Sequence, residues 1–145
     1  MALNGWLLDK SAAARAEEPP TRRHLDELAG LLYLCPVGEL EQLYSIRSAG
    51  DYDDLKAAIH ESFDVVTLPV DVFDRALELQ RDLAHHHGMW HRTPIPVLLI
   101  AETALHHGLG VVHVDRDYER DCGGPSSQGP AGRIATPWIQ AAYRR

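Results

Sequence analysis

The sequence has few cysteines, no long apolar run and no excess of positive charge, and each shortage excludes a class of protein. Its two cysteines, Cys35 and Cys122, belong to no CxxC pair or ligand-spaced cluster. We therefore expect neither a disulfide framework nor a structural zinc site. The longest apolar stretches, 97–100 and 110–112, fall far short of the roughly 20 residues that a membrane helix requires. No membrane span is expected.

Charge and the first residues narrow the function further. The chain carries 21 acidic residues against 14 lysines and arginines, a net charge of -7, which argues against a broad basic surface for nucleic acid. Any contact with RNA has to be local. Residues 1–16 have no basic start and Asp9 interrupts their apolar run, so they do not resemble a secretory signal, and we expect a cytoplasmic protein. The absence of a Gly-rich strand-to-helix loop argues against a nucleotide binder of flavodoxin type.

The chain contains short apolar runs that alternate with segments of helical periodicity. Runs typical of strands occupy 5–8, 31–35, 64–68 and 110–114, and helical spacing follows from 21, 36, 51, 71 and 97. This alternation predicts an α/β fold, a three-layer sandwich in which a mostly parallel sheet is flanked by helices on both faces. We expect one domain over 1–145, with a Gly/Pro/Ser-rich loop at 121–133.

Local patterns give more specific expectations for the first helices. Ser11 is a plausible N-cap for a helix that starts after Asp9. Glu39 and Glu41 project from the helix over 36–48 in a different direction from its apolar residues. Glu39 could support Glu41, but we expect it to face water. The residues that recur on one apolar face of this helix are Val37, Leu40, Leu43 and Tyr44.

Four acidic residues are candidates for one site. Asp9 and Asp115 each follow an apolar strand, and ligands bind at the C-terminal ends of parallel strands. Glu41 and Asp117 are the other two. Gathering carboxylates is costly unless a cation neutralises them, and oxygen ligands suit Mg²⁺. The alternative is that these residues are ordinary turn and capping acids in a chain that has 21 of them.

Four segments, in this order, resemble the VapC branch of the PIN-domain family: LLDKSA, CPVGELEQLYSIRS, HRTPIPVLLIAETALHHG and VVHVDRDYE. The resemblance extends from about residue 6 to residue 119. It implies a PIN-like fold and a metal-dependent endoribonuclease, the toxin of a type II toxin-antitoxin pair, which cuts transfer or ribosomal RNA. It also implies a cognate VapB-type antitoxin and a homodimer. By the same resemblance, Asp9, Asp115 and Asp117 hold Mg²⁺, for which Mn²⁺ can substitute, and Glu41 helps to position the attacking water.

One departure from the family pattern concerns the metal. Relatives have an aspartate at the start of the helix that is predicted from residue 97, where this chain has Val97. Glu102 lies five residues further on, about 140° away around the helix, so it is a poor substitute. We expect weaker metal binding and lower activity. The alternative is a catalytically inactive PIN-fold module that binds antitoxin or RNA without cleavage.

The histidines and tryptophans have simpler explanations than catalysis. His85, His86, His87 and His91 could suggest a metal site, but consecutive histidines on a helix point in different directions, and a solvated helix end is favoured. We expect His113 to be a packed core residue. Trp6, Trp90 and Trp138 are scattered along the chain, which favours packing over stacking on bases.

Overall fold

A computed structural model describes residues 3–86 and 92–113. Within these residues, four short strands form one parallel sheet in the order β3-β2-β1-β4. The strands are β1 (Trp6–Leu8), β2 (Leu32–Leu34), β3 (Asp64–Val65) and β4 (Gly110–Val112). Each lies inside an apolar run from which a strand was predicted. The predictions for Asp115, Asp117 and the loop at 121–133 concern residues outside the described ranges.

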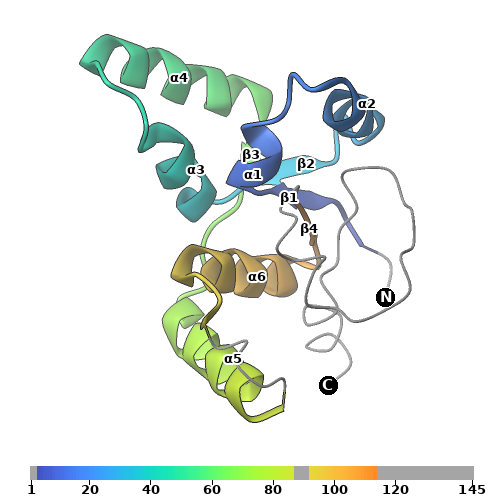
Figure 1. The fold of residues 1–145 in the computed structure, drawn as a ribbon, viewed down its shortest axis with the longest axis vertical. Helices are drawn as coiled ribbons and strands as arrows, with labels where there is room; N and C mark the ends of the chain where they lie inside the picture. Colours follow the sequence, from blue (N-terminus) through green and yellow to red (C-terminus); the bar gives the residue numbers. More distant parts are fainter. Residues whose placement is uncertain (1–2, 87–91, 114–145) are drawn as a thin grey trace.

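The helices cover both faces of the sheet (Figure 1). They are α1 (Lys10–Ala13), α2 (Pro19–Glu27), α3 (Pro36–Leu43), α4 (Ala49–Ser62), α5 (Val72–His86) and α6 (Ile95–His107). One apolar cluster joins the sheet to α3, α5 and α6. A second cluster joins the other face to α1, α2 and α4. The predicted three-layer α/β sandwich is therefore confirmed.

Strand β1 lies in the middle of this arrangement and is buried on both faces. Leu7 is 1% exposed and belongs to the first cluster, whereas Leu8 is 4% exposed and belongs to the second. Successive residues of a strand point to opposite faces, so two neighbouring leucines connect both layers. Burial of each contributes about 1.5–3 kcal/mol. The apolar run before Asp9 thus anchors the residue that follows it.

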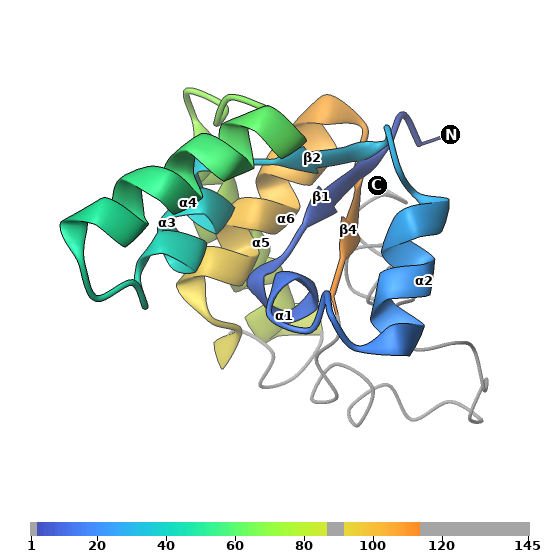
Figure 2. The same cartoon turned by 90° about the horizontal axis from the view of Figure 1, so that it is seen from above.

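The strand order creates a switch point between β1 and β4. The chain runs from β1 outward to β2 and β3, then returns to β4 on the other side of β1. The backbone N–H of Asp9 donates to the carbonyl of Val112 at 2.9 Å, so these two strands end together. Figure 2 shows α1 at this end of β1 and β4. In open α/β sheets, ligands bind in the crevice at such a point.

Helix ends agree with the predictions in part. Gly108 adopts φ 65° and ends α6, because a left-handed residue is easiest for glycine. The prediction of Ser11 as an N-cap is wrong: Asp9 is the N-cap of α1, and its side chain accepts from the Ser11 N–H. The helix expected from Thr21 begins at Pro19, and the one expected over 36–48 ends at Leu43.

Among the helices of the described ranges, none is long and apolar enough to span a bilayer.

Candidate functional site

Asp9 is held in place by its position between a strand and a helix. Its carboxylate Oδ2 accepts hydrogen bonds from the Ser11 N–H at 3.0 Å and the Ser11 hydroxyl at 2.7 Å. Both bonds come from the first turn of α1, where backbone N–H groups lack partners within the helix. No donor among the described residues bonds to Oδ1. Ser11 thus fixes one of the two carboxylate oxygens.

Gly38 brings α3 close to the end of β1. A Cβ at this glycine would lie 3.5 Å from the carbonyl oxygen of Leu8 and 3.3 Å from Leu34 Cδ1, so even alanine would be tight. Residues three apart share one side of a helix, and Glu41 is three residues after Gly38. The close approach therefore directs Glu41 toward Asp9, which follows Leu8.

The electrostatics of Glu41 agree with this placement. Burial raises the pKa of the Glu41 carboxyl, the negative charge of Asp9 raises it further, and the positive charge of Lys10 lowers it. Glu41 is partly exposed, so water still screens these interactions. Asp9 contributes to the shift after burial, and the contact between α1 and α3 holds the elements that carry the two carboxylates together. The structure thus brings together two of the four predicted site residues.

Lys10 and Tyr44 lie beside this carboxylate pair. The Lys10 Nζ is 5.8 Å from the centre of the Tyr44 ring, within the range of a cation–π contact. Tyr44 is the C-cap of α3 and is 86% exposed. Nothing in the sequence pattern distinguished these two residues as neighbours, because the fold brings them together across α1 and α3.

The predicted apolar face of α3 is therefore only half correct. Val37 and Leu43 are buried, but Leu40 is 66% exposed and Tyr44 is 86% exposed. Leu40 and Tyr44 are four residues apart and therefore neighbours on the surface of α3, and both lie outside the core.

The prediction that Glu39 faces water is wrong. Its side chain is 12% exposed, and its carboxylate Oε1 is 2.7 Å from Nε2 of His60. His60 belongs to α4, which packs against α3 and covers this side of the helix. The partner lies 21 residues away in sequence. Glu39 thus links two helices and leaves Glu41 as the carboxylate that α3 offers to the site.

Helix α6 contributes no acid at the position where the family pattern has one. Val97 lies in its first turn and packs against the larger apolar cluster. Glu102 is 8% exposed on the same helix. The pKa of Arg75 on α5 is raised first by its hydrogen bond to Asp71, with a contribution from the charge of Glu102. Glu102 is thus close to α5, in agreement with the prediction that it does not replace a ligand at Val97.

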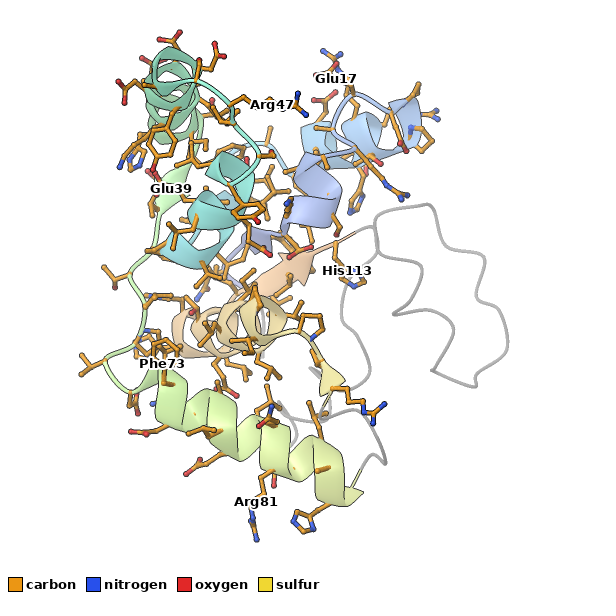
Figure 3. All side chains as sticks on the ribbon, turned by 60° about the vertical axis from the view of Figure 1, so that its left-hand side comes forward. Glu17, Glu39, Arg47, Phe73, Arg81 and His113 are labelled. Carbon is orange, nitrogen blue, oxygen red and sulfur yellow. The ribbon has the colours of Figure 1, made fainter. Side chains whose placement is uncertain are left out.

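The other two predicted acids, Asp115 and Asp117, lie outside the described ranges. Among the residues that are described, no group of three or more potential metal ligands is gathered. The described chain stops one residue after β4, at His113, which is 8% exposed, as predicted for a packed residue. Figure 3 shows His113 at the end of β4.

Comparison with known proteins identifies the family. The chain is 54% identical over 118 residues to Ribonuclease VapC17 of Mycobacterium tuberculosis, an alignment that covers 79% of this chain and 85% of that protein. It belongs to the VapC ribonuclease family. A second relative, Ribonuclease VapC21 of the same organism, is 41% identical over 117 residues, 79% of this chain and 84% of that protein. No protein-family model matches the chain.

Solved structures share the fold of this VapC chain at low sequence identity. One is the crystal structure of DNA-bound VapBC from Salmonella typhimurium, with a TM-score of 0.65, 16% identity and coverage of 84% of this chain and 95% of that one. Another is a toxin-antitoxin complex from Klebsiella pneumoniae, with a TM-score of 0.63, 14% identity and coverage of 83% and 92%. The chain therefore shares its three-dimensional fold with these solved structures.

Proposed function

We propose that this VapC chain is the Mg²⁺-dependent endoribonuclease toxin of a type II toxin-antitoxin pair and hydrolyses RNA in the cytoplasm. Mn²⁺ can substitute for Mg²⁺. The observation that carries the proposal is the pair of carboxylates, Asp9 and Glu41, at the switch point of the sheet. Burial and then the negative charge of Asp9 raise the pKa of Glu41, and a divalent cation would relieve the repulsion between the two carboxylates.

The donor set fits a hard cation. Carboxylate oxygens are the ligands that Mg²⁺ prefers, and Ser11 orients Asp9 through Oδ2 so that Oδ1 remains for the metal. Asp115 and Asp117 are the further ligands of the proposal. Asp115 is three positions after Val112, which is bonded to Asp9, so the chain from Val112 to Asp115 spans at most roughly 11 Å.

The chemistry divides among these side chains. Bound Mg²⁺ lowers the pKa of a coordinated water and neutralises charge on the phosphate. Asp9, Asp115 and Asp117 hold the cation. Glu41, as a carboxylate, accepts a hydrogen bond from the attacking water and orients it toward the phosphorus. Ser11 keeps Asp9 from rotating away from the metal by fixing one of its oxygens.

Val97 modifies this proposal. A valine supplies no ligand where the family pattern has an aspartate, so this chain would hold Mg²⁺ with one carboxylate fewer, and a water could take its place because Mg²⁺ commonly keeps several waters. The chain then needs more Mg²⁺ to reach full activity. The second candidate function is an inactive PIN-fold module that binds RNA or antitoxin without cleavage, and the apolar packing of Val97 is what favours it.

The proposed partner is a VapB-type antitoxin. It would dock in a groove that is lined by residues of the helices and of the sheet. This groove has a volume of about 540 Å³ and is lined by residues of α1, α2, β2 and α4, among them Leu25, Leu32 and Phe63. Gln42 also lines it, and the buried Nε2 of this amide has no partner among the described residues. A peptide carbonyl of the antitoxin would satisfy that donor. The proposal also includes a homodimer, the assembly that the resemblance implies.

The test is cleavage of RNA as a function of Mg²⁺, with Asp9→Asn as the variant. Asparagine keeps the shape but loses the charge, and the expected loss of rate is on the order of 100-fold or more, because metal charge stabilisation is worth several kcal/mol. Asp53→Asn, at an exposed position of α4, is the matched control and should cleave like the parent. Equal cleavage by parent and Asp9→Asn, or cleavage in EDTA, would contradict the metal mechanism. A parent that binds RNA but never cleaves it would favour the inactive module.

A further inference from the structure

Lys10 and Tyr44 form a pair at the edge of the site that the hydrolytic proposal does not use. The ammonium of Lys10 is 5.8 Å from the centre of the Tyr44 ring, and the tyrosine is 86% exposed. A single cation–π contact at an exposed position stabilises a fold by only about 0.5–1 kcal/mol. Core packing therefore does not explain why a large aromatic ring stands at this position.

The location of the pair follows from the carboxylates. Lys10 directly follows Asp9, and Tyr44 is three residues after Glu41, about one helical turn further along the chain. The charge of Lys10 reaches Glu41, since it lowers the pKa of that carboxyl. A molecule whose phosphate lies at the carboxylates would therefore have its neighbouring groups at Lys10 and Tyr44.

The net charge makes such a local contact necessary. With a formal charge of -7, the chain repels RNA as a whole, so binding depends on the few cations beside the site. Lys10 is one of them. Arg47 is exposed in the connection that follows α3, from which its side chain extends in Figure 3. An exposed aromatic ring next to a lysine combines the two elements with which proteins bind single-stranded nucleic acid.

We propose that Tyr44 is a stacking platform for an unpaired RNA base and that Lys10 contacts the phosphate next to that base. The substrate class is then single-stranded RNA or the loop of a folded RNA. In an A-form duplex the faces of the bases are stacked on one another and unavailable to a side chain. The proposal rests on the ribonuclease function for its substrate, but the binding step does not depend on cleavage.

The decisive experiment separates binding from hydrolysis. A fluorescein-labelled single-stranded oligoribonucleotide is titrated with protein in Ca²⁺ buffer, and anisotropy gives Kd for the parent, Tyr44→Ala, Tyr44→Phe and Lys10→Ala. Loss of one stacked base weakens binding by about 5- to 100-fold, so we expect this for Tyr44→Ala, while Tyr44→Phe stays within about twofold. Lys10→Ala should weaken binding and reduce the slope of log Kd against log salt by about one.

Matched controls address fold and specificity. Tyr52→Ala removes another tyrosine, 38% exposed on α4, and should bind like the parent. Thermal melting should be nearly unchanged in Tyr44→Ala because the ring is exposed. In Mg²⁺, the same variant should raise KM for single-stranded RNA and largely retain kcat. A structural role for Tyr44 would change melting and leave Kd alone.

If the parent binds the oligoribonucleotide, three results would overturn the inference. They are unchanged Kd in Tyr44→Ala, equal weakening by Tyr44→Ala and Tyr52→Ala, and binding of a duplex of the same sequence as tightly as the single strand. Failure of the hydrolytic proposal is a different result, in which the parent cleaves no RNA while Kd still depends on Tyr44. A parent that binds no oligoribonucleotide overturns the platform.

Discussion

The helices α3 and α6 pack against each other, but they bring opposite kinds of side chain to the end of the sheet. Helix α3 contacts the end of β1 through Gly38 and offers Glu41 to Asp9. Helix α6 has Val97 in its first turn, packed among apolar side chains. On the α3 side, the carboxylates of Glu41 and Asp9 repel each other when no cation is bound. On the α6 side, Val97 offers a cation no ligand. The fold alone therefore does not determine how tightly the site holds metal.

The largest expected effect comes from restoring an acid on α6, which would remove the difference between α3 and α6 at the site. Val97→Asp should lower the Mg²⁺ concentration for half-maximal cleavage by about tenfold, because one additional carboxylate ligand is worth at least about 1.4 kcal/mol of binding. Cleavage rates measured across a Mg²⁺ series test this. Val97→Asn has nearly the same size without the charge and should give a smaller gain. If parent and Val97→Asp respond equally to limiting Mg²⁺, Val97 is not what weakens the site.

Much of the fold was predictable because β1 and β4 are apolar on both faces. Leu7, Leu8 and Val112 are buried, and their runs end at residues that the sequence already marks as polar. The limits of α3 were not predictable, since the periodicity of 36–48 continues past Leu43, where the helix ends. Periodicity describes the face of a helix and not how far it extends over the core.

The candidate site was predictable only where the backbone determines it. Asp9 follows a buried strand, so its location depends on the sheet. Glu39 and Tyr44 were misjudged because their surroundings come from other elements: His60 of α4 covers Glu39, and Lys10 of α1 lies near the exposed Tyr44 ring. Such pairings join residues that are far apart in sequence, and no local pattern contains them. The roles of Asp115 and Asp117 remain predictions.

The anchoring of α3 gives an effect of intermediate size. Glu39→Ala removes the contact with His60 and should lower the free energy of unfolding by about 1 kcal/mol, since the carboxylate is 12% exposed and the bond is short. Urea denaturation measures this. The control is Glu27→Ala, which removes a contact of 3.7 Å between an exposed carboxylate and His24 on the same helix and should change stability by less than about 0.5 kcal/mol. Equal effects in both variants would show that Glu39 does not anchor α3 to α4.

The smallest effect concerns the repulsion between Glu41 and Asp9 in the absence of metal. Because folding raises the pKa of Glu41 above its ordinary value of 4.5, the folded state prefers the protonated carboxyl. The stability that this preference contributes is present below pH 4.5 and is lost as the pH rises through the raised pKa. At neutral pH, Glu41→Gln in EDTA should therefore be more stable than the parent, by less than about 1 kcal/mol for a partly exposed group. Thermal melting between pH 4.5 and 8 should show the advantage growing with pH.

The same variant distinguishes local repulsion from net charge. Glu61→Gln removes one negative charge at an exposed position of α4 and should gain less stability than Glu41→Gln at neutral pH. Addition of Mg²⁺ should then reverse the order of the parent and Glu41→Gln, because a cation that binds only the folded state stabilises the protein that binds it more tightly. If Mg²⁺ raises the melting temperatures of the parent and of Glu41→Gln equally, Glu41 does not face the metal. In that case α3, like α6, would offer the cation no carboxylate.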